Sequence, residues 1–234
     1  MASPIKLLLL AAVIFYSVLF NAAASQLQAE EIPLNAILMG QQEVPPVSTA
    51  AGGGARLVVD TTANSLSYHI SLASLGSAET AAHIHGPAGA GQNGPAAHVL
   101  PLGNSKIGVW IYPASAEDDI LAGRYYINVH TVDQPTGEIR GQINHFNSIM
   151  DEEQMVPPSG SSAFGWGTFN IDRAANELSY YMQFSGINSP EIAAHIHARA
   201  VHGAFSAPLL LLDPGLLKVG IWNYPEAVED DIMD

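Results

Sequence analysis

Two histidines separated by one apolar residue, His83-Ile84-His85, are the residues whose types and spacing best suit chemistry. In a β-strand the side chains of residues i and i+2 point to the same face, so the two imidazoles would lie side by side while Ile84 enters a core. Neutral imidazole nitrogens are common ligands of copper and zinc. The pattern returns as His195-Ile196-His197, so the sequence contains two candidate half-sites for a metal ion.

Two more histidines are candidates for completing the first site, His98 and His130. His130 ends a strand-like run in which Tyr126, Asn128 and His130 share one face, so it belongs to a polar surface rather than to a core. Three or four neutral imidazoles suit copper or zinc, and a catalytic site would keep one coordination position open. The candidate metal ligands of the first half are therefore His83, His85, His130 and His98.

The second half-site is weaker, because neither His98 nor His130 has a histidine counterpart there, and we rank His195 and His197 lower. In the first half, Asp133 and Glu138 lie near enough in sequence to orient an imidazole by accepting its hydrogen bond. The competing interpretation involves no metal. A histidine pair at positions i and i+2 of a strand is commonly a surface pair that hydrogen-bonds neighbouring turns.

The overall composition excludes several classes of function. The chain has 234 residues, of which 48% are hydrophobic and 13% charged, and its formal net charge is −14. It contains no basic cluster, so nucleic acid is not an expected partner. It contains no cysteine, which rules out disulfides, thiolate metal ligands and cysteine nucleophiles.

The first residues have the pattern of a secretory signal peptide. One basic residue, Lys6, precedes a run of 14 residues at 7–20 that is apolar apart from Ser17, and small residues follow up to Ser25. The run is shorter than the roughly 20 residues that span a bilayer. We expect a signal peptide at 1–24, cleavage near Ala24, and a secreted mature chain without a membrane span. An uncleaved signal that anchors the chain is the alternative.

A single spacing relates five separated landmarks of the two halves, which indicates an internal duplication. Each landmark recurs 112 positions later: Val44-Pro45-Pro46, Asn64 to Tyr68, His83 with His85, Trp110 to Pro113, and Glu117 to Ile120. At this offset Asp234 corresponds to Ala122, so segment 123–143 has no counterpart. We expect one domain at 34–145 and a truncated second copy at 146–234 that lacks the final strands.

Short alternating runs separated by turn residues predict an all-β fold. Strands are expected at 36–40, 55–60, 65–72, 81–85, 96–100, 107–111, 124–130 and 137–143, and a short helix or turn at 115–122. Seven or eight short strands indicate an antiparallel β-sandwich, of the immunoglobulin-like or superoxide-dismutase-like kind, duplicated in tandem.

Several of these motifs, in this order, resemble the CHRD domain, which takes its name from chordin. They are Gln42-Glu43-Val44-Pro45-Pro46, Leu66-Ser67-Tyr68, Ala82 to Ala88, Asn93-Gly94-Pro95, Tyr126 to Thr131, and Pro135 to Gln142. The resemblance covers 34–144 in full and 155–234 in part. It implies an extracellular β-sandwich module, found in chordin within a protein that binds bone morphogenetic proteins, and it implies no established enzymatic activity.

Three functions are compatible with these features. The first is a secreted, non-enzymatic CHRD module that binds an extracellular protein or matrix component and holds copper or zinc at His83, His85 and His130. The second is a metalloenzyme similar to Cu/Zn superoxide dismutase, although the cysteine pair and zinc loop of that enzyme are absent. The third is a purely structural repeat. An unpaired strand edge in the shortened second copy predicts a homodimer through that edge.

Overall fold

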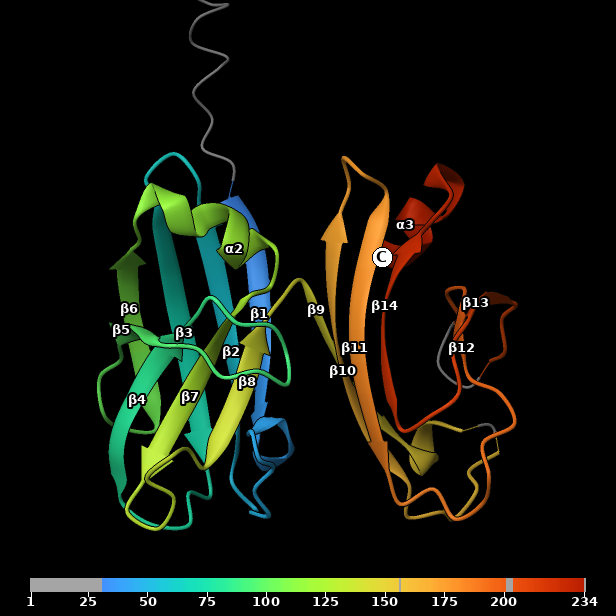
Figure 1. Cartoon of the computed structure of the whole chain (residues 1–234), viewed down its shortest axis with the longest axis horizontal. Coiled ribbons are helices and arrows are strands. Elements are labelled where there is room, and N and C mark those ends of the chain that lie inside the picture. The colour runs from blue at the N-terminus through green and yellow to red at the C-terminus, as the bar shows by residue number, and fades with distance from the viewer. Residues whose placement is uncertain (1–30, 156, 201–203, 234) are drawn as a thin grey trace, which may run out of the picture.

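The computed structural model describes residues 31–155, 157–200 and 204–233, which form a mostly β protein in two parts (Figure 1). The first part is one antiparallel sheet of eight strands, in the order β5-β4-β7-β8-β1-β2-β3-β6. Its strands are β1 (Glu31–Met39), β2 (Gly52–Asp60), β3 (Ser65–Ala73), β4 (Glu79–His85), β5 (Ala96–Val99), β6 (Ser105–Ile111), β7 (Tyr125–Thr131) and β8 (Ile139–Ile143). The predicted strands are all present, and β1 begins five residues earlier than expected.

Alternating side chains and local turn chemistry explain why these segments form strands. In β3, Leu66, Tyr68 and Ile70 are buried, while the residues between them are more exposed. The hairpin from β2 to β3 turns where the Asp60 carboxylate accepts hydrogen bonds from the backbone of Thr62 and Ala63. The connection from β6 to β7 contains the 3-10 turn η2 (Ala114–Ala116) and the helix α2 (Glu117–Leu121), at the position predicted for a helix or turn.

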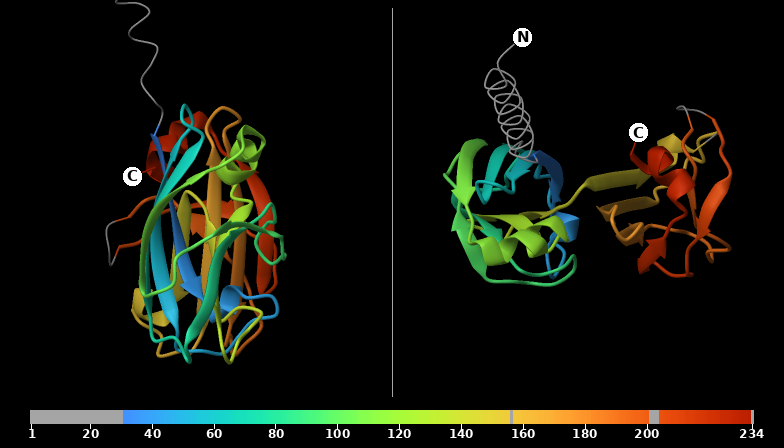
Figure 2. Two further views of the ribbon diagram at one scale, coloured as in Figure 1. Left: turned by 90° about the vertical axis from the view of Figure 1, so that its left-hand side faces the viewer. Right: turned by 90° about the horizontal axis from the view of Figure 1, so that it is seen from above.

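The eight strands curve into a near-barrel rather than two separate sheets. The edge strands β5 and β6 lie at opposite ends of the strand order, yet the rings of His98 and Trp110 stack between them with centroids 5.7 Å apart. Figure 2 shows this curvature from above. The prediction of an antiparallel, strand-rich fold is confirmed, and the sandwich takes the form of one strongly curved sheet. Its interior is filled by the apolar side chains of every strand, among them Leu57, Ile84 and Ile127.

Three of the candidate ligands, His83, His85 and His130, lie on the outer face of β4 and β7. Ala82 and Ile84 of β4 pack into the core, as do Ile127 and Val129 of β7, and all four are fully buried. Because strand side chains alternate, the residues between them project to the other face. Pairing of Ala81 with His130 and of His83 with Asn128 fixes the two strands side by side in that register.

The second part contains a four-stranded sheet in the order β14-β11-β10-β9 and a separate pair, β12 with β13. Its elements are β9 (Phe146–Asp151), η3 (Glu152–Gln154), β10 (Phe164–Asp172), β11 (Glu177–Ser185), β12 (His195–His197), β13 (Pro208–Leu211), β14 (Leu217–Asn223), η4 (Glu226–Val228) and α3 (Glu229–Met233). The bounds of β10, β11, β13, β14 and α3 lie 112 residues after those of β2, β3, β5, β6 and α2. The spacing found in the sequence therefore recurs in the placement of the strands.

The core of the second part is smaller than that of the first. Its buried cluster consists of Ile171, Leu178, Trp222 and Tyr224. Within the described residues no strand corresponds to β7 or β8, so β12 and β13 pair only with each other and β9 forms an edge of its sheet.

A buried ion pair ties β6 to the start of β4. The ammonium group of Lys106 is fully buried and donates to the Glu79 carboxylate at 2.6 Å. It also donates to the carbonyl oxygens of Pro101 and Gly103 at 2.7 and 2.8 Å. All three ammonium hydrogens therefore have acceptors, which a buried charge requires.

The expected signal peptide and its cleavage near Ala24 lie outside the described residues. None of the helices within those residues has the length and apolar character needed to cross a membrane.

Candidate metal centre

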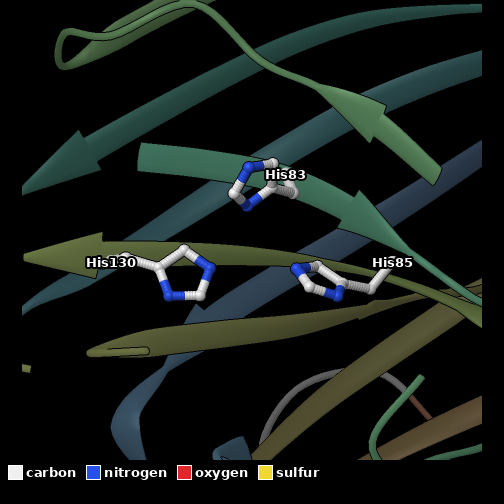
Figure 3. Close-up of side chains that lie close together, drawn as sticks. All are labelled: His83, His85 and His130. Carbon is white, nitrogen blue, oxygen red and sulfur yellow. The ribbon is translucent and has the colours of Figure 1, made fainter. Parts of the chain in front are cut away.

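Three imidazole rings face one another on the outer face of the first sheet. His83 and His85 project from β4 and His130 from β7 (Figure 3). The ring centroids are 5.4 Å apart for His83 and His85, 5.2 Å for His83 and His130, and 5.9 Å for His85 and His130. One nitrogen from each ring lies within 4.8 Å of the others, and this is the only such ligand group among the described residues.

The facing nitrogens are shielded from solvent and have no hydrogen-bond partner. They are Nδ1 of His83, Nε2 of His85 and Nε2 of His130. A buried polar atom without a partner costs about 1–3 kcal/mol, so a converging set of three needs an explanation. A shared metal ion would supply a partner for all three at once.

The other nitrogens of two rings are held by backbone carbonyls. His85 Nδ1 lies 3.0 Å from the carbonyl oxygen of Gly94, and His130 Nδ1 lies 3.1 Å from that of Pro135. A carbonyl oxygen can only accept, so each Nδ1 carries the proton and each neutral ring presents its Nε2 lone pair to the centre. This second hydrogen bond is typical of histidines that bind metal.

The electrostatic surroundings favour the neutral rings that metal binding requires. Burial lowers the pKa of His85, against the opposing hydrogen bond to Gly94, and neighbouring His83, His130 and Arg140 lower it further. Burial and the neighbouring His83 likewise lower the pKa of His130. At neutral pH both rings are therefore uncharged, with their lone pairs available.

Binding of a metal ion would require only small movements of the three facing nitrogens. Bonds of about 2.0–2.1 Å in a tetrahedral zinc site place ligand nitrogens about 3.3 Å apart. The three nitrogens would each move inward by small rotations of their rings. The three protein ligands would leave a fourth coordination position open, as in catalytic zinc sites.

His98 does not lie with the other three. It stands opposite Ile84 across the pairing of β4 and β5, and residues directly opposite in a ladder share a face. Its ring stacks on Trp110 and meets Tyr68 edge-on at 6.0 Å. Burial lowers the pKa of His98, so it is a neutral, inward-facing ring at the seam of the near-barrel.

The second histidine pair keeps part of the arrangement. The rings of His195 and His197 are 5.7 Å apart. His197 Nδ1 lies 2.9 Å from the carbonyl oxygen of Ser206, which matches the contact of His85 with Gly94 at an offset of 112. Both residues are exposed, and no third imidazole joins them within the described residues.

The expectation that Asp133 or Glu138 would orient an imidazole is wrong. The Pro135 carbonyl oxygen occupies that role for His130. Glu138 instead accepts hydrogen bonds from the Thr49 hydroxyl at 2.7 Å and the Gly76 backbone at 2.9 Å. Asp133 is exposed. The Glu138 carboxylate therefore holds the neighbouring segments at Thr49 and Gly76, and main-chain carbonyls orient the rings of His85 and His130.

The family description of the CHRD domain matches residues 34–143 and 146–215. The chain belongs to the CHRD domain family. Neither the comparison with curated proteins nor the comparison with solved structures found a match. In this CHRD protein the histidine triad lies within the first matched segment, and the pair His195 and His197 lies within the second.

The sequence did not single out a buried polar cluster beside the triad of this CHRD protein. Arg140 is 1% exposed and lies over the ring of Tyr126, 3.6 Å from its centroid. Tyr126 in turn stacks on His85, with centroids 5.1 Å apart and planes at 14°. The sequence contains a signal for this cluster, because side chains alternate between the two faces of β8. This alternation places Arg140 and Gln142 on the same face as Tyr126.

Glu43, which follows η1 (Gly40–Gln42), adds a buried carboxyl to this cluster. It is 5% exposed, and burial raises its pKa to about 7, although Arg140 and Asn128 oppose the shift. The segment before β8 passes close by at Gly137, whose φ is +135°. A Cβ there would lie 2.5 Å from Asn128 Oδ1 and 2.7 Å from Glu43 Oε1, so only glycine fits this position.

Replacing Glu43 with glutamine is expected to raise the free energy of unfolding at pH 8 by roughly 2 to 3 kcal/mol, and to change it little at pH 5. The folded protein keeps the Glu43 carboxyl protonated up to a pKa of about 7, whereas the unfolded chain ionises it near 4.5. The folded state therefore loses stability as the pH rises from 4.5 through 7. Urea unfolding at the two pH values measures this difference, and an equal effect at both would contradict the assignment.

Proposed function

We propose that this CHRD protein is a secreted binding module that holds one copper or zinc ion at His83, His85 and His130. One observation carries the metal assignment: three nitrogens that are shielded from solvent and have no partner converge from two strands. The donor set consists of neutral imidazoles, which suit copper and zinc better than magnesium or calcium. The two carbonyl contacts that fix the ring tautomers support the same conclusion.

We also propose that the chain contains two CHRD units, at 34–145 and 146–234. In this proposal each unit has a β-sandwich fold, and the second copy is truncated. The matching offset of the strands and of the ion pair supports this division. Lys218 donates to Glu191 at 2.7 Å and to the Asp213 carbonyl at 2.7 Å, in the same arrangement that joins Lys106 to Glu79. In this proposal the first unit carries the metal site and the second keeps only its first two ligands.

The proposed setting is extracellular and the proposed partner is a protein or matrix component. The signal-like segment at 1–24 supports secretion. An apolar stripe on the outer face of the edge strand β6, formed by Ile107, Val109 and Ile111, is suited to a protein contact because each residue is more than half exposed. The unpaired edges of β9 and β12 support the alternative contact, a homodimer through the second unit.

Metal analysis of the purified protein tests the proposed function. The protein loaded with copper or zinc is expected to retain one ion per chain after gel filtration. The double variant His83→Ala, His85→Ala is expected to retain none. No stoichiometric metal in the unaltered protein would refute the proposal. The single His195→Ala variant is the matched control, because it removes an exposed imidazole from the second pair and should leave the stoichiometry at one.

A turnover assay on the loaded protein separates the binding module from an enzyme similar to superoxide dismutase. The binding proposal predicts that superoxide decay in the presence of the copper-loaded protein equals that with the double variant. A rate that rises in proportion to bound copper would favour the redox enzyme instead.

A further inference from the structure

Arg140 connects β8 to the loop that follows the first histidine pair. Its Nη1 donates to the carbonyl oxygen of Gln92 at 2.8 Å, and its Nη2 donates to that of Gly89 at 3.2 Å and to Gln142 Oε1 at 2.8 Å. Gln142 in turn donates from Nε2 to the carbonyl oxygen of Ala88 at 2.9 Å. The buried side chains of Arg140 and Gln142 therefore bind the loop 86–95 at the carbonyl oxygens of three residues.

That loop and the ring of Tyr126 hold His85 from two sides. The Tyr126 hydroxyl accepts a hydrogen bond from the Gly94 backbone at 3.1 Å, and the Gly94 carbonyl accepts one from His85 Nδ1 at 3.0 Å. The Tyr126 ring stacks on His85, and the Arg140 guanidinium carbon lies 3.6 Å from the centroid of the same ring. Both supports of His85 therefore depend on Arg140. Its guanidinium lies over the Tyr126 ring in a cation–π contact, and its hydrogen bonds fix the loop.

The charge of Arg140 is only partly balanced. Glu43 is the neighbouring carboxyl, and burial raises its pKa to about 7, so at neutral pH its negative charge offsets Arg140 only in part. The three ligand imidazoles bring no negative charge to the centre. A bound ion therefore meets a positive field from Arg140, and that field opposes a divalent ion twice as strongly as a monovalent one.

We propose that Arg140 is a positioning residue for His85, acting through Tyr126 and the loop 86–95, and that its charge biases the triad toward copper(I) over zinc(II). This inference rests on the proposed function, because it concerns the ion held by the same three histidines. A trigonal set of neutral nitrogens accommodates copper(I) without a compensating anion. The Tyr126 ring separates the guanidinium from His85, and at such a separation an effective dielectric constant of about 20 makes the bias on the order of tenfold.

Competition titrations with copper(I) and zinc(II) on the full chain test the two parts of the proposal separately. Arg140→Met removes both the clamp and the charge. Loss of the clamp lowers both affinities, but loss of the charge raises the affinity for zinc(II) more than that for copper(I), so the copper-to-zinc ratio should drop on the order of tenfold. Arg140→Lys keeps the charge but loses the planar fork, so both affinities should fall while the ratio stays near that of the unaltered protein. An unchanged ratio in Arg140→Met overturns the charge assignment, and unchanged affinities in Arg140→Lys overturn the positioning role.

Glu43→Gln supplies a test of the charge that leaves the clamp in place. At pH 8 the unaltered carboxyl is ionised and offsets Arg140, so its removal should raise the copper-to-zinc ratio by a similar factor. This shift is opposite in direction to that of Arg140→Met, and a merely structural role of Arg140 would not produce it. No shift in the Glu43→Gln protein would contradict the charge assignment even if Arg140→Met did not fold.

A measurement on the metal-free protein separates this inference from the proposed function. The Nδ1 proton of His85 is expected to give an observable NMR signal in the unaltered protein, because Gly94 protects it. Tyr126→Leu should abolish that signal and leave the corresponding signal of His130, which is held by Pro135, in place. If the unaltered protein binds no metal, the proposed function fails but the positioning role is still decided by these signals. Persistence of the His85 signal in Tyr126→Leu would overturn the positioning role.

Discussion

Replacing His130 with alanine is expected to lower the affinity for copper and zinc by roughly 100-fold or more. Loss of an orienting partner alone costs about 10- to 100-fold in metal affinity, and a direct ligand should cost at least as much. His130 is the only one of the three that comes from β7. The variant keeps the pair His83 and His85, so it measures what the third nitrogen adds. Isothermal titration of the metal-free protein, with a competing chelator, gives the two affinities.

His98→Ala is the matched control for this experiment. His98 is also a partly buried histidine of the first part, but it projects to the seam with Trp110 rather than to the triad. Its removal should leave the metal affinity unchanged while destabilising the fold through lost ring contacts. Equal losses of affinity in His98→Ala and His130→Ala would contradict the three-histidine site and restore His98 as a ligand.

The second large effect is expected at the ion pair between β6 and β4. Glu79→Ala should lower the free energy of unfolding by about 3–5 kcal/mol, because it leaves the Lys106 ammonium buried beside two carbonyls without its counter-charge. Lys106 is fully buried and only 8% of the Glu79 side chain is exposed. Chemical denaturation followed by tryptophan fluorescence measures the change, because Trp110 and Lys106 lie in the same strand, β6.

Asp119→Ala tests whether burial is the cause. The pair of Arg124 and Asp119 has the same 2.6 Å separation, but 53% and 29% of the two side chains are exposed. An exposed pair contributes about 0–1 kcal/mol, so this variant should be nearly neutral. If the two substitutions destabilised the protein equally, the pairing distance rather than the burial would govern the energy, and our account of Lys106 would be wrong.

The strands of the first part were predictable because their signals are local. The alternation of Leu66, Tyr68 and Ile70 and the turn residues after Asp60 are read directly from adjacent positions. The curvature was not predictable in this way. It depends on edge strands β5 and β6, distant in the sheet order, meeting through His98 and Trp110. The alternation of apolar side chains along each strand is compatible with either a flat sandwich or a closed sheet.

The candidate site was predictable to the same extent as the strand faces. His83, His85 and His130 follow from the two-residue periodicity of β4 and β7, whose side-by-side pairing the structure supplies. The location of His98 depends on strand register, which places it opposite Ile84 and so on the inner face. The orienting carbonyls could not be predicted at all, because every residue has a carbonyl and only the three-dimensional course of the loops selects Gly94 and Pro135.

The strand order has a consequence for when the site can exist during synthesis of the chain. β1 pairs with β8 through Met39 and Arg140, and β4 pairs with β7 through His83 and Asn128. Contacts between such distant segments form late, because the loops between them must close first. His83 and His85 leave the ribosome well before His130. A nascent chain therefore offers only the first histidine pair, and the third imidazole of the candidate site arrives with the step that pairs β7 with β4.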